Sequence, residues 1–125
     1  MGQQVGTGGI YEPGALLVHD EPRVWGSIAW LTNQAKHGLD VTVGYVEIEV
    51  GRSNPLHLHP NCTEIIVVLQ GRLEHVVGDR VAELAPNDVL LVHPGVQHQG
   101  TNIGDVPVRL LVVYDSGVRQ FEAVT

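Results

Sequence analysis

Short apolar runs, each ended by Gly, Pro, Asn or Asp, recur along most of this chain and favour strands over helices. No window longer than about ten residues holds the apolar i, i+3, i+4 pattern of an amphipathic helix without Gly or Pro. The runs are rich in Val, Ile, Leu and Tyr, which suit a pleated strand. We expect one helical turn around 31–37 and strands near residues 15–19, 24–31, 41–50, 54–59, 64–70, 72–77, 80–84, 88–93 and 107–115.

The turns and the side-chain periodicity agree with this interpretation. Gly78-Asp79 separates two apolar runs, as a two-residue hairpin loop does. Side chains alternate in residues 41–50, so that Val46 and Ile48 point to one face and Tyr45 and Glu49 to the other. Many short strands with turns between them are typical of a β-sandwich or a β-barrel. We therefore predict an all-β fold.

The length and composition indicate one globular domain. The chain has 125 residues, of which 43% are hydrophobic and 17% are charged. Residues 1–14 are rich in Gly and contain Pro13, so we expect an irregular N-terminal arm there. Residues 15–125 should form a single domain, and we find no internal repeat of convincing period.

The charge balance excludes some classes of partner. The formal net charge is −7, whereas a nucleic-acid or anionic-membrane surface needs clustered Lys and Arg. Cys62 is the only cysteine, so no internal disulfide forms, which fits a reducing compartment. The first residues lack the positive and apolar segments of a signal peptide. We expect a cytoplasmic protein without a nucleic-acid or membrane partner.

Three histidines and one glutamate are candidate metal ligands. His57 and His59 are two apart on an expected strand, so their rings leave the same face about 7 Å apart at the backbone. Two such rings can reach one ion at about 2.1 Å each. We expect an adjacent antiparallel strand to place Glu64 beside them, and His98 to approach from the far side after a turn. The spacing alone is equally compatible with histidines that only pack in a core.

Residues 51–102 resemble the two sequence motifs of the cupin family. The first motif, glycine-x5-His-x-His-x4-Glu-x6-glycine, is matched at every specified position by Gly51, His57, His59, Glu64 and Gly71.

The second cupin motif, glycine-x5-proline-x-glycine-x2-His-x3-Asn, is matched in part. Gly95, His98 and Asn102 agree with it, whereas Asn87 replaces a glycine and His93 replaces a proline. Asn adopts the left-handed backbone conformation more readily than most residues, so the change at position 87 is mild.

The resemblance implies a cupin double-stranded β-helix, which is a jelly-roll barrel of two packed sheets, with a metal site near one mouth. The metal ligands would be His57, His59, Glu64 and His98. Three neutral imidazoles and one carboxylate would leave positions open on an octahedral ion for water or substrate. This ligand set suits one divalent transition metal: Fe, Mn, Co, Ni or Zn.

Two functions agree with such a site. The first is an enzyme that acts on a small oxygenated molecule, such as a sugar, a keto acid or a phenolic, through Lewis-acid catalysis. Isomerase, lyase, decarboxylase and dioxygenase reactions all fit this description. The alternative is a non-catalytic cupin that binds or senses a small molecule or a metal. We favour the enzyme, because the site keeps open coordination positions and we expect no effector domain beside the barrel.

Other residues are candidates for roles beside the metal. His93 and Glu49 are the candidates for moving a proton, although His93 could simply end a strand and pack. Tyr45 and Gln70 would also line the barrel if they point inward. Cys62 lies between two of the ligands, where a small loop residue is the simpler explanation.

Two runs indicate a further interface. Residues 65–69 are apolar at every position and residues 108–113 at every position except Arg109, so another sheet or another subunit should cover their second face. Small cupins commonly pair, and the resemblance therefore implies a homodimer. The N-terminal arm and these two strands are the expected contact surfaces.

Overall fold

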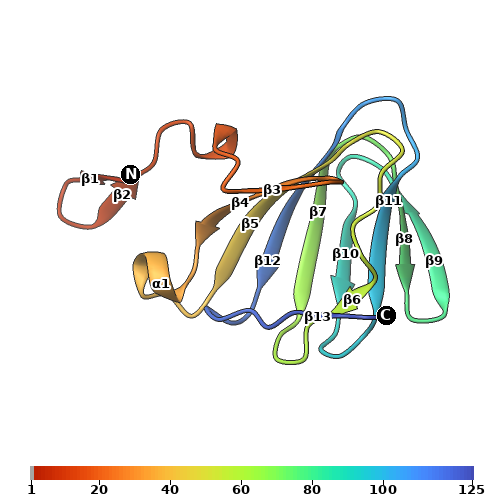
Figure 1. The fold of residues 1–125 in the computed structure, drawn as a ribbon. Helices are drawn as coiled ribbons and strands as arrows, with labels where there is room; N and C mark the ends of the chain where they lie inside the picture. Colours follow the sequence, from red (N-terminus) through yellow and green to blue (C-terminus); the bar gives the residue numbers. More distant parts are fainter. Residues whose placement is uncertain (1) are drawn as a thin grey trace.

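Two antiparallel sheets make up most of the protein, whose computed structural model describes residues 2–125 (Figure 1). The larger sheet has the order β10-β7-β12-β5-β4-β3, formed by β3 (Glu21–Arg23), β4 (Gly26–Thr32), β5 (Thr42–Ile48), β7 (Glu64–Gln70), β10 (Val89–Val92) and β12 (Val108–Tyr114). The smaller sheet has the order β13-β6-β11-β8-β9, formed by β6 (His57–Leu58), β8 (Leu73–Val77), β9 (Arg80–Leu84), β11 (His98–Asn102) and β13 (Glu122–Ala123).

The path of the chain between the sheets defines the fold. From β5 onward the chain enters the smaller sheet at β6 and returns to the larger one at β7. It crosses again for β8 and β9, for β10, for β11 and for β12. This repeated crossing winds two antiparallel layers around one interior, and the predicted all-β jelly roll is confirmed.

The core fills the space between the sheets. Alternate residues of β5, β7 and β12 point inward and are buried: Val46, Ile48, Ile66, Val68, Leu110 and Val112. Leu73 and Leu84 meet them from the smaller sheet. Val46 and Ile48 share one face of β5, as their alternation predicts, and the structure shows that this face is the inward one.

The N-terminal part of the chain differs from expectation. The arm is not irregular throughout, because β1 (Gln3–Val5) and β2 (Gly9–Tyr11) form a short hairpin. In place of a strand at 15–19, Ala15–Leu17 forms a 3-10 turn closed by a hydrogen bond from Leu17 N to Gly14 O. The division into an arm, 1–14, and one barrel domain, 15–125, stays a prediction.

The expected helical turn is present as α1 (Gln34–His37). Asn33 caps its first turn, since its side-chain oxygen accepts a hydrogen bond from Lys36 N at 2.8 Å. Gly38 ends it in the left-handed conformation with φ 68°. No helix within residues 2–125 has the length and apolar character that a membrane span requires.

Besides the N-terminal hairpin and the short β3, the strands β11 and β13 were not anticipated from the sequence. β11 begins at His98 and is mostly polar, and β13 has only two residues. Neither has the apolar run by which we identified the other strands. β11 is a strand because β6 and β8 pair with it on both sides, which is a tertiary cause.

Four motif positions, Gly51, Gly71, Asn87 and Gly95, have a left-handed backbone conformation. Asn87 adopts φ 78° where the cupin motif has glycine, as its tolerance of the left-handed region predicts. Gly71 has φ 88°, and a Cβ built there would come within 3.1 Å of the backbone of Val108. Glycine is therefore required at position 71 both by conformation and by space.

Candidate metal centre

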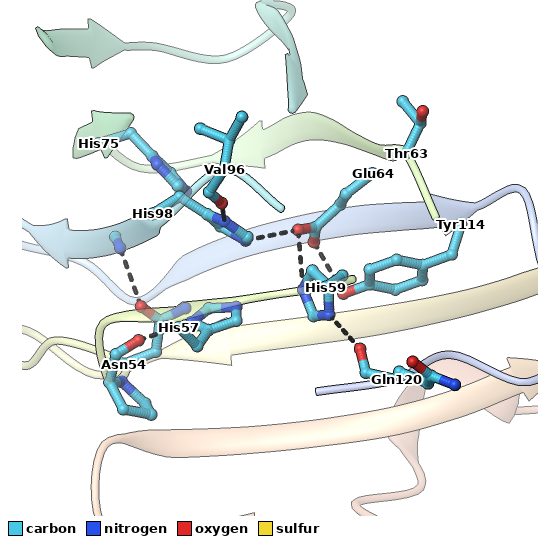
Figure 2. A network of polar contacts seen from close by, with 12 residues as sticks. Asn54, His57, His59, Thr63, Glu64, His75, Val96, His98, Tyr114 and Gln120 are labelled. Carbon is cyan, nitrogen blue, oxygen red and sulfur yellow. Dashed lines mark hydrogen bonds and ion pairs between the residues drawn. The ribbon is translucent and has the colours of Figure 1, made fainter. Parts of the chain in front are cut away.

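Strand register brings the four candidate ligands together from both sheets. His57 on β6 pairs directly with His98 on β11, and His59 follows the end of β6. Glu64 opens β7 in the larger sheet and points toward the histidines (Figure 2). The expected arrangement is thus reversed: His98 lies on the strand beside His57, and Glu64 approaches from the other sheet. The physical reason is that the chain changes sheet between β6 and β7.

The candidate ligand atoms converge on one small volume. One side-chain donor atom from each of His57, His59, Glu64 and His98 lies within 4.8 Å of the others, and all four residues are buried. His98 Nε2 is 2.8 Å from Glu64 Oε1, and His59 Nε2 is 3.4 Å from the same oxygen. The ring of His57 is 4.2 Å from that of His98 and 4.9 Å from that of His59, measured between centroids.

The outer nitrogen of each ring fixes its orientation. Every Nδ1 of the three lies near a backbone carbonyl: Pro55 for His57 at 2.6 Å, Gln120 for His59 at 2.8 Å and Val96 for His98 at 2.9 Å. A carbonyl only accepts hydrogen bonds, so in the neutral ring Nδ1 carries the proton and Nε2 keeps its lone pair. This is the tautomer that a metal ligand needs, held by backbone contacts.

The carboxyl group of Glu64 has a second partner. Tyr114 pairs with Glu64 between β12 and β7, and its hydroxyl donates to Glu64 Oε2 at 2.7 Å. Burial opposes ionisation, but the rings of His59 and His98, whose Nε2 atoms lie 3.4 and 2.8 Å from Glu64 Oε1, outweigh it and hold the pKa of Glu64 well below its usual range. Burial, and then the charge of Glu64, raise the pKa of Tyr114. At neutral pH Glu64 is anionic and Tyr114 is a donor.

The protonation and packing of the histidines fit a divalent cation. Burial, followed by the charge of His98, lowers the pKa of His57 to about 4, so this ring is neutral at neutral pH. His59 Nε2 is buried and has no hydrogen-bond partner among residues 2–125. Such unpaired buried atoms are rare in folded proteins. A lone pair beside an anionic carboxylate oxygen is favourable when a cation lies between them.

A cavity of about 370 Å³ adjoins this cluster. One part of its wall is apolar, formed by Trp25, Ile28, Val46, Ile66, Leu110 and Val112. The other part carries the polar groups His57, Glu64, His75, His98, Tyr114 and Arg119. A mostly apolar hollow with a few convergent polar groups is the usual form of a small-molecule site.

The C-terminal segment, which we define as residues 114–121, closes the site. The ring of Phe121 stacks on His57 at 4.9 Å with an interplanar angle of 23°. The segment is held by Asn61, whose side chain accepts from Gln120 N at 3.0 Å and donates to Val118 O at 2.7 Å. Sequence reasoning missed this role. The sequence placed Tyr114 in the expected strand 107–115 without indicating a direction for its side chain, and the structure buries it at the end of β12.

His75 belongs to neither cupin motif, yet it lies at the site. Its side chain is buried, lines the cavity and stacks on His98 with ring centroids 5.7 Å apart. Burial, followed by the charge of His98, lowers the pKa of His75 to about 4. Its position on β8, opposite Gly100 of β11, brings it there.

The candidates for proton transfer are placed elsewhere. His93 and Glu49 are exposed and do not line the cavity, because each follows the end of its strand. Tyr45 is buried but its hydroxyl donates to Glu47 at 3.3 Å, and Gln70 donates to Pro107 O at 2.9 Å. Neither of them lines the cavity.

Known proteins resemble this chain over its barrel. The family model described as "Cupin domain" matches residues 44–114. Germin-like protein 3-8 of Oryza sativa subsp. japonica is 31% identical over 83 residues, which is 62% of this chain and 37% of that protein.

Solved structures share the fold. The formate complex of Lactobacillus farciminis oxalate decarboxylase has a TM-score of 0.77 at 22% identity, covering 83% of this chain and 32% of that one. Oxalate oxidase in complex with the substrate analogue glycolate has a TM-score of 0.74 at 21% identity, covering 80% and 55%. The chain therefore spans about a third to a little over half the length of these relatives.

Proposed function

This chain belongs to the cupin family, and on that premise we propose that it is a metal-dependent enzyme acting on a small oxygenated molecule. One divalent transition metal ion (Fe, Mn, Co, Ni or Zn) would be held by His57, His59, Glu64 and His98. The observation that carries the proposal is the convergence of one donor atom from each within 4.8 Å, beside a cavity.

The groups around the site would have different chemical roles. A bound divalent cation would act as a Lewis acid on a carbonyl or on a water molecule. Glu64 and Tyr114 form a hydrogen-bonded pair that keeps the carboxylate oriented. The apolar wall excludes water, which strengthens electrostatic interactions inside the cavity. His75 and Tyr114 line the cavity, so they are the candidate side chains for proton transfer to or from the substrate.

The comparisons support a small substrate. Oxalate decarboxylase and oxalate oxidase, which share the fold, are enzymes named for a small acid. A sugar, a keto acid or a phenolic would have comparable oxygen ligands for the metal. We propose a reaction of the isomerase, lyase, decarboxylase or dioxygenase class.

Metal removal and return would test this function. Elemental analysis of the purified chain should show about one divalent transition metal per protomer. A panel of sugars, keto acids, oxalate and phenolics should include a compound whose turnover stops on chelation and returns on addition of the same metal. Retained metal with ligand binding but no turnover would favour a binding or sensing cupin. Absence of any bound metal would contradict the metal-dependent enzyme and leave only a cupin that binds a small molecule.

We also propose a homodimer, because one outer surface is apolar. Ile65 and Leu69 on β7 and Val89 and Leu91 on β10 are exposed at 37% to 62% of their surface. These strands are neighbours, so the four side chains share one face of the larger sheet. Sedimentation equilibrium would distinguish a dimer from a monomer by mass.

A cytoplasmic location is our proposal for the compartment. Cys62 is a buried free thiol, and burial, then the charge of Asp115, raise its pKa. A buried thiol that stays protonated reacts slowly with oxidants. A free thiol of this kind is compatible with a reducing compartment such as the cytoplasm.

A further inference from the structure

Arg119 is a cation in the cavity wall without a matching anion. Its guanidinium carbon lies 4.9 Å from the ring centroid of Trp30, 5.3 Å from that of Tyr114 and 5.2 Å from that of Phe121. Its Nε atom is buried without a hydrogen-bond partner among residues 2–125. Within the same residues no carboxylate forms an ion pair with it.

This arrangement is incomplete as it stands. A guanidinium remains charged at all relevant pH values, and an unpaired charge in a partly apolar wall is unfavourable. The three aromatic faces offset some of this through cation–π attraction. The other arginine of the cavity, Arg23, already pairs with Glu21 at 2.6 Å. The charge that lacks a partner in this cavity is therefore that of Arg119.

Arg119 and the candidate metal centre share two aromatic neighbours. Phe121 stacks on His57 at 4.9 Å, and its ring centroid also lies 5.2 Å from the guanidinium carbon of Arg119. The hydroxyl of Tyr114 bonds to Glu64, and the same ring lies beneath the guanidinium. A molecule of a few heavy atoms in the 370 Å³ cavity can therefore contact both places at once.

We propose that Arg119 binds a carboxylate group of the substrate, so that the substrate is a small organic acid with a second oxygen-bearing end for the metal. This inference rests on the proposed function and names its substrate class. A guanidinium offers paired N–H donors that match the two oxygens of a carboxylate. A phosphate dianion would require more positive charge than one unpaired arginine supplies.

Matched ligands separate the contribution of Arg119 from that of the metal. Malate and 2-hydroxybutyrate have the same hydroxy-acid end, which can bind a metal, but only malate has a second carboxylate. The Co²⁺-loaded full chain should bind malate at least about tenfold more tightly than 2-hydroxybutyrate in calorimetry. Arg119→Gln should abolish this preference and leave the affinity for 2-hydroxybutyrate within about twofold.

Two further variants serve as controls. Arg119→Lys keeps the charge and should retain part of the preference, which also guards against misfolding of the glutamine variant. Arg109→Gln removes a positive charge that pairs with Glu47 on the outer face. This variant should retain the whole preference for malate over 2-hydroxybutyrate.

The possible outcomes separate the two proposals. A chain that holds no Co²⁺ contradicts the proposed function, and this inference with it. A chain that holds Co²⁺ but binds the two acids equally, or whose malate preference survives in Arg119→Gln, overturns the inference alone. Displacement of malate by inorganic phosphate at lower concentration would overturn the choice of a carboxylate.

Discussion

The strands that carry the candidate ligands and the C-terminal segment 114–121 build one site in different ways. The ligand region supplies side chains of fixed chemical type: three imidazoles and a carboxylate. The C-terminal segment supplies one backbone carbonyl to His59, a stacked ring on His57 and a hydroxyl to Glu64. The C-terminal segment thus orients His59 and Glu64, whereas His57 and His98 take their ring orientation from carbonyls two residues earlier in the chain.

This difference has a consequence for how each region tolerates change. A ligand atom has no substitute, because other side chains at these positions lack a donor with the same reach. A carbonyl contact depends only on the path of the backbone, and Asn61 holds that path by two hydrogen bonds. We therefore expect larger effects from substitutions in the ligand region than in the C-terminal segment.

The largest effect should follow from loss of one ligand. His59→Ala is expected to lower metal occupancy by at least about tenfold while the barrel stays folded, since even residues that only orient ligands change affinity by about 10–100-fold. The metal content per protomer measures the occupancy, and circular dichroism shows whether the barrel is folded. His93→Ala, at an exposed histidine, should retain its metal. Equal metal content in both variants would count against the site.

The next effect is a dependence of stability on pH caused by His75, which stacks on the candidate ligand His98. Burial, then the charge of His98, hold the pKa of His75 at about 4, below the value of 6.5 expected in the unfolded chain. Between these values the unfolded state binds the proton and the folded state does not, so stability falls as pH falls from 6.5 toward 4. His75 alone accounts for about 3 kcal/mol over that range.

A non-titrating side chain at position 75 checks this dependence. Urea unfolding of the metal-free chain should give a shallower decline for His75→Asn than for the original chain between pH 6.5 and 4.5. Above pH 7 the two curves should run parallel, because His75 is neutral in both states. An equally steep decline in both proteins would show that His75 is not the group responsible.

The smallest effect should follow from a change in the C-terminal segment. Tyr114→Phe removes the hydroxyl that donates to Glu64 Oε2, while the four candidate ligands and the packing of the ring stay unchanged. We expect a loss of metal affinity of up to about tenfold, at the low end for groups that orient a ligand. Competition with a chelator measures it, and Tyr11→Phe in the exposed hairpin is the matched control. A loss larger than that of His59→Ala would reverse the contrast between the two regions.

Much of the fold was accessible from sequence because its signals are local. The apolar runs of β7 and β9 were predicted with the bounds that the structure shows. β11 was missed because its polar residues become a strand only through neighbours on both sides. The segment 15–19 was misassigned because an apolar run without a pairing partner does not become a strand.

The candidate site divides in the same manner. The residue types and spacing at 57, 59, 64 and 98 can be read directly from the sequence. The left-handed conformation of Asn87 could also be predicted from its residue type. Which strand lies beside which was decided by the crossing between sheets, and this put His98 next to His57 and Glu64 opposite. Arg119, Gln120 and Phe121 follow no motif. Only the packed chain brings them to the site, because contacts between distant segments depend on the whole fold and not on local pattern.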